Sequence, residues 1–152
     1  MSLDKKFQEL FTKMVEISFE YVNRNVKEVE GIYIYNAMEG GEYCYNVFYK
    51  INNNIVESHE VNLVSEEQYD VSDERCFGML ELGSGYLENI EKLFKKSERN
   101  IPTLLKMFYN PKTGEFNNDI SYEFNYLNHE ERIAEDGFEE WIIEEKNKLA
   151  EV

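Results

Sequence analysis

Histidines, serines and glycines that could take part in catalysis are present, but their spacing does not match a catalytic or metal-binding motif. His59-Glu60 and His129-Glu130 lack the second histidine, one helical turn away, that a zinc-binding helix requires. Gly83-Ser84-Gly85 lacks the Lys-Ser/Thr ending of a phosphate-binding loop and the outer glycines of a nucleophile elbow. We therefore expect that the chain is not an enzyme. A small hydrolase would need a deep pocket that gathers a histidine with carboxylates.

The two cysteines and the acidic segment after residue 60 give no stronger indication of a bound group. Cys44 and Cys76 lie far apart and form no C-x-x-C pair, which favours two free, mostly buried thiols in a reducing cytoplasm. The carboxylates of residues 66–74 lack the spacing and the glycine of a calcium-binding loop. We expect no metal ion and no cofactor.

Asp119 and Glu123 lie four residues apart in a segment with the alternation of a strand, and therefore share one face. Four strand residues span about 13 Å, which is too far for the paired carboxylates of a glycosidase. Carboxylates displayed on a rigid sheet can instead pair with Arg or Lys side chains of a protein partner. The alternative is an ordinary solvated sheet face.

The charge of the chain limits its possible partners. It carries 31 acidic and 16 basic residues, for a formal net charge of −15. Direct binding to nucleic acid or to an anionic membrane surface is disfavoured, because both need clustered Lys and Arg. Residues 31–72 and 128–152 hold most of the acidic excess. Such a surface would attract a basic protein, although a high acidic content is also common without a binding role.

The segment Leu104–Tyr126 predicts a hairpin, which is the clearest structural signal in the chain. Residues 104–109 are apolar, and residues 110–114, Asn-Pro-Lys-Thr-Gly, are typical of a turn. The second strand alternates, with one side expected to pack in the core: Phe116, Ile120, Tyr122, Phe124 and Tyr126. Its other side is polar and acidic, which is typical of an antiparallel sheet with one wet face.

The remaining elements follow from the spacing of apolar residues. A helix is expected over residues 4–26, a meander of strands over 29–38, 43–51 and 55–61, and a last helix over 130–150. Between them, Gly78, Gly83 and Gly85 predict a loose first part and a firm helix only from about Gly85 to Ser97, unless a backbone packs closely against the glycines. The expected fold is one α+β domain over residues 1–152, with an antiparallel sheet of about five strands and the order α-β-β-β-α-β-β-α. No apolar run is long enough for a membrane span.

The tyrosine-rich meander YIYNAMEGGEYCYNVFYKINN, the hairpin MFYNPKTGEFNNDISYEFNY and an acidic helix with a tryptophan together resemble the YezG-like family. The resemblance covers nearly the whole chain. It implies an α+β fold and a cytoplasmic antitoxin, or immunity protein, that neutralises the nuclease domain of a polymorphic bacterial toxin. The alternative function is a non-enzymatic homodimer with a structural or regulatory role.

The resemblance, together with the charge, indicates where a toxin would dock. A nuclease site is basic because it holds phosphates, so carboxylates could occupy it. The predicted partner-binding residues are exposed acids and one interfacial tyrosine: Asp119, Glu123, Glu66, Glu67, Asp70 and Tyr109. Tyr122 is a weaker candidate, because its side chain is expected to point inward.

Overall fold

The computed structural model describes residues 3–39, 42–123 and 134–151. It has the α+β class and the element order that the sequence predicts. The elements are α1 (Leu3–Tyr21), β1 (Val29–Glu39), β2 (Glu42–Ile51), β3 (Asn54–Glu57), the 3₁₀ helix η1 (Ser58–Leu63), α2 (Asp73–Lys96), β4 (Leu104–Tyr109), β5 (Phe116–Ser121) and α3 (Ala134–Ala150).

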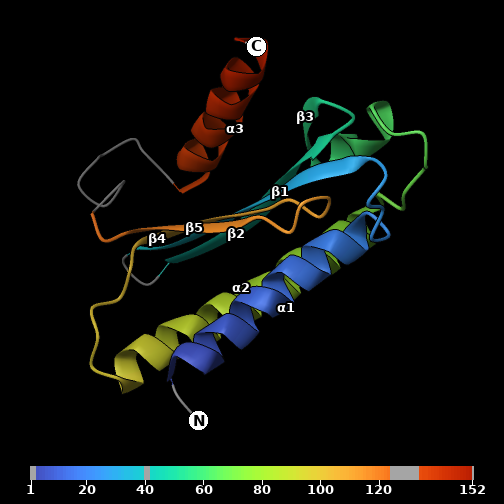
Figure 1. Ribbon diagram of the computed structural model, residues 1–152. Helices are drawn as coiled ribbons and strands as arrows, with labels where there is room; N and C mark the ends of the chain where they lie inside the picture. Colours follow the sequence, from blue (N-terminus) through green and yellow to red (C-terminus); the bar gives the residue numbers. More distant parts are fainter. Residues whose placement is uncertain (1–2, 40–41, 124–133, 152) are drawn as a thin grey trace.

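The five strands form one antiparallel sheet in the order β3-β2-β1-β4-β5. β1 is central and pairs with β2 on one side and β4 on the other. Figure 1 shows the pair α1–α2 on one face of this sheet and α3 on the opposite face. The predicted meander and hairpin are therefore confirmed as the two parts of one sheet.

Tyrosines tie the helix pair to the sheet, which explains their abundance in the meander. Tyr49 is fully buried and donates its hydroxyl to the carbonyl oxygen of Ser18, at 2.7 Å. The hydroxyl of Tyr45 lies 3.0 Å from Oγ of Ser18. Tyr21 donates to the carbonyl of Ser58, at 3.0 Å. Each buried hydroxyl thus has a partner, so its burial carries no large desolvation penalty.

The opposite face is covered by α3 through an aromatic cluster. Phe138 and Trp141 of α3 pack on Tyr33, Tyr35 and Phe48 of the sheet. The rings of Phe48 and Trp141 meet edge to face, with centroids 5.0 Å apart, a favoured aromatic geometry. The predicted helix start near residue 130 lies outside the described residues.

The prediction of a loose segment before Gly85 is wrong, because helix α2 runs without a break from Asp73 to Lys96. Ser72 caps it by accepting from the backbone N–H of Arg75. Close packing explains Gly83, where a Cβ would overlap the ring of Tyr45. It does not explain Gly78 or Gly85, where a Cβ would meet nothing within 4 Å.

Two other elements are shorter than predicted, and each ends for a local reason. α1 ends at Tyr21 rather than near residue 26, because Asn23 and Arg24 adopt left-handed backbone angles. β3 ends at Glu57, where the chain turns into η1. The side chains of Glu57 and Glu60 cap that turn reciprocally.

The hairpin contains the clearest correction to the sequence analysis. Phe116 and Ile120 share the face of α1 and α2, as expected, but their side chains are 42% and 43% exposed. Tyr122, predicted inward, is 54% exposed. The helix pair packs mainly on β1 and β2, and β5 lies two strand spacings, about 10 Å, beyond β1. The helices therefore do not cover β5. Phe124 and Tyr126 lie outside the described residues.

No helix among residues 3–39, 42–123 and 134–151 is both long enough and apolar enough to cross a membrane.

A candidate acidic binding surface

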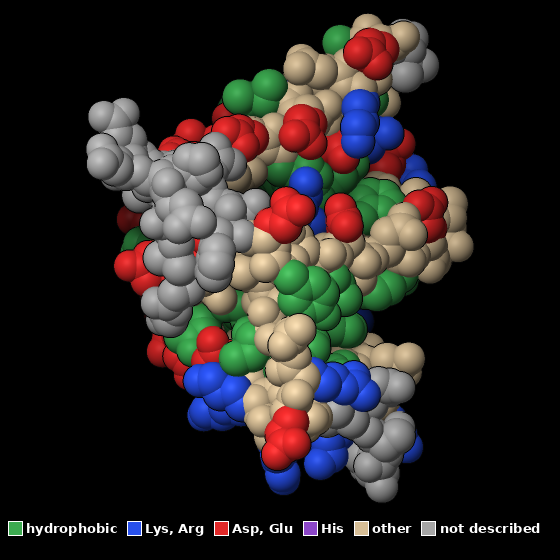
Figure 2. Space-filling view, turned by 90° about the vertical axis from the view of Figure 1, so that its left-hand side faces the viewer, with side chains coloured by type: hydrophobic (Ala, Val, Ile, Leu, Met, Phe, Trp, Pro, Cys, Tyr) green, Lys and Arg blue, Asp and Glu red, His purple; other side chains and the backbone are tan. Residues whose placement is uncertain are grey.

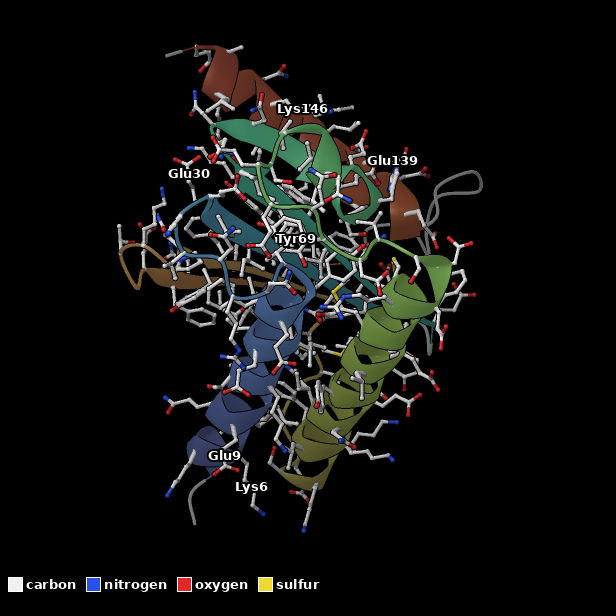
Figure 3. The ribbon with its side chains drawn as sticks, turned by 90° about the vertical axis from the view of Figure 1, so that its right-hand side faces the viewer. Lys6, Glu9, Glu30, Tyr69, Glu139 and Lys146 are labelled. Atoms are coloured by element: carbon white, nitrogen blue, oxygen red, sulfur yellow. The ribbon has the colours of Figure 1, made fainter. Side chains whose placement is uncertain are left out.

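Three connections meet at one end of the molecule, which we call the loop end. They are residues 22–28 between α1 and β1, residues 52–53 between β2 and β3, and residues 64–72 between η1 and α2. In Figure 3, Tyr69 and Glu30 mark this end, whereas Lys6 and Glu9 mark the opposite end of α1. The predicted residues Glu66, Glu67 and Asp70 all lie here and are exposed.

The backbone of the loop end is fixed by two turns with left-handed residues. Asn23 and Arg24 have φ angles of 53° and 52°, and Asn52 and Asn53 have 49° and 64°. Two successive left-handed residues form the tight hairpin turn that matches strand twist, and Asn tolerates this conformation best. Asn52-Asn53 confirms the predicted turn between β2 and β3. The left-handed Arg24 is the less usual case.

The carboxylate of Glu28 joins the three connections. Glu28 is only 6% exposed. It accepts from the side-chain amides of Asn25 (3.0 Å) and Asn52 (3.1 Å) and from the hydroxyl of Tyr69 (3.0 Å). It also accepts from the backbone N–H groups of residues 66 and 67. One buried carboxylate therefore holds the first turn, the second turn and the acidic loop together.

This network determines the ionisation of Glu28. Burial alone would raise its pKa, but the hydrogen bonds from the backbone of Glu66, from Asn52 and from Tyr69 outweigh it, so the pKa lies below the ordinary 4.5. The pKa of Tyr69 is raised, because its ring is buried and its hydroxyl faces Glu28. Glu28 is thus ionised at neutral pH although it carries no lysine or arginine partner among its recorded contacts.

Two of the exposed carboxylates of the loop end, those of Glu67 and Asp70, are also held by neutral donors. Glu67 accepts from the side-chain amides of Asn23 (2.6 Å) and Asn25 (3.3 Å). Asp70 accepts from the backbone N–H of Ser72 (3.0 Å), which lowers its pKa. Neutral donors fix the position of a carboxylate without cancelling its charge. The loop end therefore presents oriented negative charge to solvent.

The nearest arginines form their recorded contacts with other groups, although the charge of Arg75 also helps to lower the pKa of Asp70. Arg24 pairs with Glu20, at 2.9 Å. Arg75 donates to the carbonyl oxygen of Glu20, at 2.8 Å, and its guanidinium carbon lies 5.7 Å from the centre of the Tyr21 ring. Within the described residues, neither arginine forms an ion pair with Glu66, Glu67 or Asp70.

Lysines gather at the other end of the helix pair. α1 and α2 are antiparallel, so the start of α1 packs on the end of α2, with the Phe7 and Phe94 rings 4.6 Å apart. This end carries exposed lysines of both helices: Lys5, Lys6, Lys92, Lys95 and Lys96. Figure 2 shows Lys and Arg side chains gathered toward the bottom of the view, with acidic and basic side chains mixed around α3 above. These lysines of the helix pair therefore lie at the end opposite the loop end.

The hairpin carries the other predicted contact residues. Asp119 is exposed on β5, directly opposite Lys106 of β4. The Nζ atom of Lys106 lies 4.9 Å from the centre of the Trp141 ring, and no ion pair joins it to Asp119 within the described chain. This cation–π contact leaves the charge of Asp119 available.

Glu123 does not lie on the strand of Asp119, where the sequence predicts it. β5 ends at Ser121, so Glu123 does not share the rigid strand with Asp119. Its carbonyl oxygen accepts from Oγ1 of Thr103, at 2.6 Å, and Thr103 bonds to Met38 near the far end of β1. Met38 is nine residues along β1 from Val29, about 30 Å at the strand rise. Glu123 and the loop end are therefore well separated.

Tyr109 lines a groove between α1 and the hairpin. The groove has a volume of about 540 Å³ and an apolar wall made by Phe11, Val15 and Phe19 of α1 with Tyr109 and Phe116. Tyr109 is partly buried, and it pairs with Ile32 in the sheet, three residues from the start of β1. It is thus nearer the loop end than Asp119 or Glu123. The structure brings Glu66, Glu67 and Asp70 together at the loop end, whereas Tyr109, Asp119 and Glu123 lie apart along the hairpin.

Sequence reasoning missed the residues that organise the loop end, namely Glu28, Asn23 and Asn25. The sequence did offer one indication of this buried carboxylate: Glu28 stands just before an apolar strand and follows two asparagines, which can donate to it. A different cluster, Glu57, His59 and Glu60, brings three ligand atoms within 4.8 Å of one another. Its two carboxylates already cap η1, which accounts for their closeness without a metal ion.

No protein-family model matches this chain, and no curated protein matches it either. The resemblance to the YezG-like family therefore stays a prediction.

Proposed function

We propose that this chain is a cytoplasmic antitoxin, or immunity protein, that binds the nuclease domain of a polymorphic bacterial toxin and performs no catalysis itself. The observation that carries the proposal is the loop end, where Glu67 and Asp70 are fixed by neutral donors above the buried Glu28. The net charge of −15 and the resemblance of the hairpin and meander support the same function.

The mechanism follows from complementary charge. A nuclease gathers cationic groups to hold phosphates, and carboxylates can take the places of those phosphates. Carboxylates that are already ordered lose little further entropy on binding, which favours affinity. The overall negative charge speeds encounter with a basic partner. The chain would then inhibit by covering the nuclease site.

The proposal requires a toxin gene with a nuclease domain beside this chain's gene, and inhibition of that domain tests it. We expect the purified chain to form a complex with an inactive variant of that domain at low salt, and to suppress cleavage by the active domain. The absence of a complex at low salt would refute the proposed function.

Reversing the charge of the loop end should weaken this complex. The double substitution Glu66→Lys with Glu67→Lys is expected to raise Kd on the order of 100-fold, because close charge pairs across an interface each contribute about tenfold or more. The control is Glu81→Lys with Glu88→Lys, the same charge change at two exposed positions of α2. Calorimetry should show a shift within roughly threefold for the control. Equal weakening by both pairs would mean that net charge, not the loop end, carries binding.

A further inference from the structure

The two edges of the sheet are protected to different degrees. β3, at one edge, has only four residues, and both η1 and α3 contact it. β5, at the other edge, has six residues, and no described strand pairs with its outer side. Natural edge strands are usually blunted by Lys, Pro, a bulge or a covering element. In the sequence of β5, Phe-Asn-Asn-Asp-Ile-Ser, the charged Asp119 is the one residue that would discourage pairing with another strand.

The hydrogen-bond pattern shows which backbone groups of β5 face outward. Met38 donates to Thr103 across β1 and β4, and Asn110 donates to Glu115 across β4 and β5. With the register of both ladders, these bonds place the N–H and C=O groups of Asn117 and Asp119 toward β4. The intervening residues direct theirs away from the sheet: Phe116, Asn118 and Ile120.

The side chains around this edge define what could pair with it. On the α1 side, Phe116 belongs to the apolar wall of the groove, and Ile120 lies on the same face of β5; both side chains are half-exposed. On the α3 side, Asp119 is exposed, and Glu115 accepts from the Asn117 side chain at 2.8 Å. An added strand would place alternate side chains on these two faces. Its apolar residues would lie beside Phe116 and Ile120, and its Lys or Arg residues beside Glu115 and Asp119.

We propose that β5 is a docking edge onto which the toxin domain adds an extended strand whose apolar residues alternate with Lys or Arg. This inference rests on the proposed function and specifies its binding mode. Backbone hydrogen bonds along β5 would supply affinity, and the two different faces would supply specificity, as in other cases of strand addition. The acidic loop end would still pair with the cationic groups of the nuclease site and speed encounter.

Amide hydrogen exchange by NMR, on the full chain with and without the inactive nuclease domain, tests the inference directly. In the free chain, the amides of Asn117 and Asp119 should exchange slowly and those of Phe116, Asn118 and Ile120 rapidly. In the complex, the three outward amides should become protected. If a complex forms but these three amides still exchange rapidly, the proposed strand addition at β5 is wrong, and the proposed function is unaffected. If no complex forms, both the strand addition and the proposed function are wrong.

Two substitutions at one position provide the matched control. Asn118→Pro removes an outward N–H and keeps the bonds to β4, and Pro is tolerated at such edge positions. Asn118→Val also removes the Asn side chain but keeps the N–H. We expect Asn118→Pro to raise Kd about tenfold or more and Asn118→Val to change it by less than roughly threefold. Equal affinity of the two variants would contradict strand addition. If Asn118→Pro does not fold, the exchange pattern of the unaltered chain decides.

A second copy of this chain is the rival occupant of the edge. If β5 of one copy pairs with β5 of another, the three outward amides should be protected even without the toxin domain. Light scattering should then give twice the mass of one chain. That result would overturn the proposal in favour of a homodimer. A monomer with rapid outward amides is the result that we expect.

Discussion

Replacing Glu28 with Ala is expected to lower the free energy of unfolding by about 3 kcal/mol. The substitution removes the recorded acceptor of the Tyr69 hydroxyl and of two backbone N–H groups, and one of the acceptors of the Asn25 and Asn52 side-chain amides. Each buried donor that loses its partner costs about 1–3 kcal/mol, although water entering the loops would offset part of this sum. Urea denaturation measures the change. The matched control is Glu30→Ala, which removes a less buried carboxylate with one recorded bond, from the backbone of Asn53. A loss for Glu28→Ala no larger than for the control would contradict the role of Glu28.

The carboxylate of Glu28 should also make the free energy of unfolding depend on pH. Because the pKa of Glu28 is lower in the folded chain than the ordinary 4.5, its contribution is present above that value and is lost as pH falls through the folded pKa. Glu28→Gln removes this titration. The difference in unfolding free energy between the unaltered chain and Glu28→Gln should therefore be largest near neutral pH and shrink below pH 4.5. A difference that is constant with pH would show that Glu28 does not titrate in this way.

Replacing Gly83 with Ala is expected to destabilise the chain by about 2–3 kcal/mol, whereas Gly85→Ala should stabilise it by up to about 1 kcal/mol. At position 83 the new Cβ would overlap the buried ring of Tyr45, whose hydroxyl is held against Ser18, so α2 must move away from the sheet. At position 85 the Cβ meets nothing, and alanine is the better helix former.

Thermal or urea denaturation should show a lower free energy of unfolding for Gly83→Ala and a higher one for Gly85→Ala, each relative to the unaltered chain. A double-substitution cycle identifies the cause, since Gly83→Ala should cost less when Tyr45 is already replaced by Leu. The same loss of stability for Gly83→Ala in both backgrounds would exclude the clash with Tyr45.

Local chemistry made the turns and the order of helices and strands along the chain predictable. The Asn-Pro-Lys-Thr-Gly turn forms as expected, with Gly114 at φ 79°, and Asn52-Asn53 turns the chain between β2 and β3. Such residues set backbone angles without reference to the rest of the fold. The alternation along β5 also gave the correct face for Phe116 and Ile120.

Features that depend on distant packing could not be predicted in this way. The alternation of β5 does not indicate how far α1 and α2 extend over the sheet, so the exposure of Phe116 was missed. Gly83 and Gly85 look alike in the sequence, and only the position of Tyr45 distinguishes them. Glu28 binds groups up to 41 residues away, and no local pattern connects these segments.

In the function that we propose, oriented carboxylates at the loop end guide a basic toxin domain to this chain. The most direct measurement is the association rate constant with the inactive nuclease domain, by stopped flow, between about 0.02 M and about 0.5 M salt. We predict a fall on the order of 100-fold over this range, and a shallower dependence for Glu66→Gln with Glu67→Gln. A rate constant that does not change with salt, or a slope that these substitutions leave unchanged, would contradict the account.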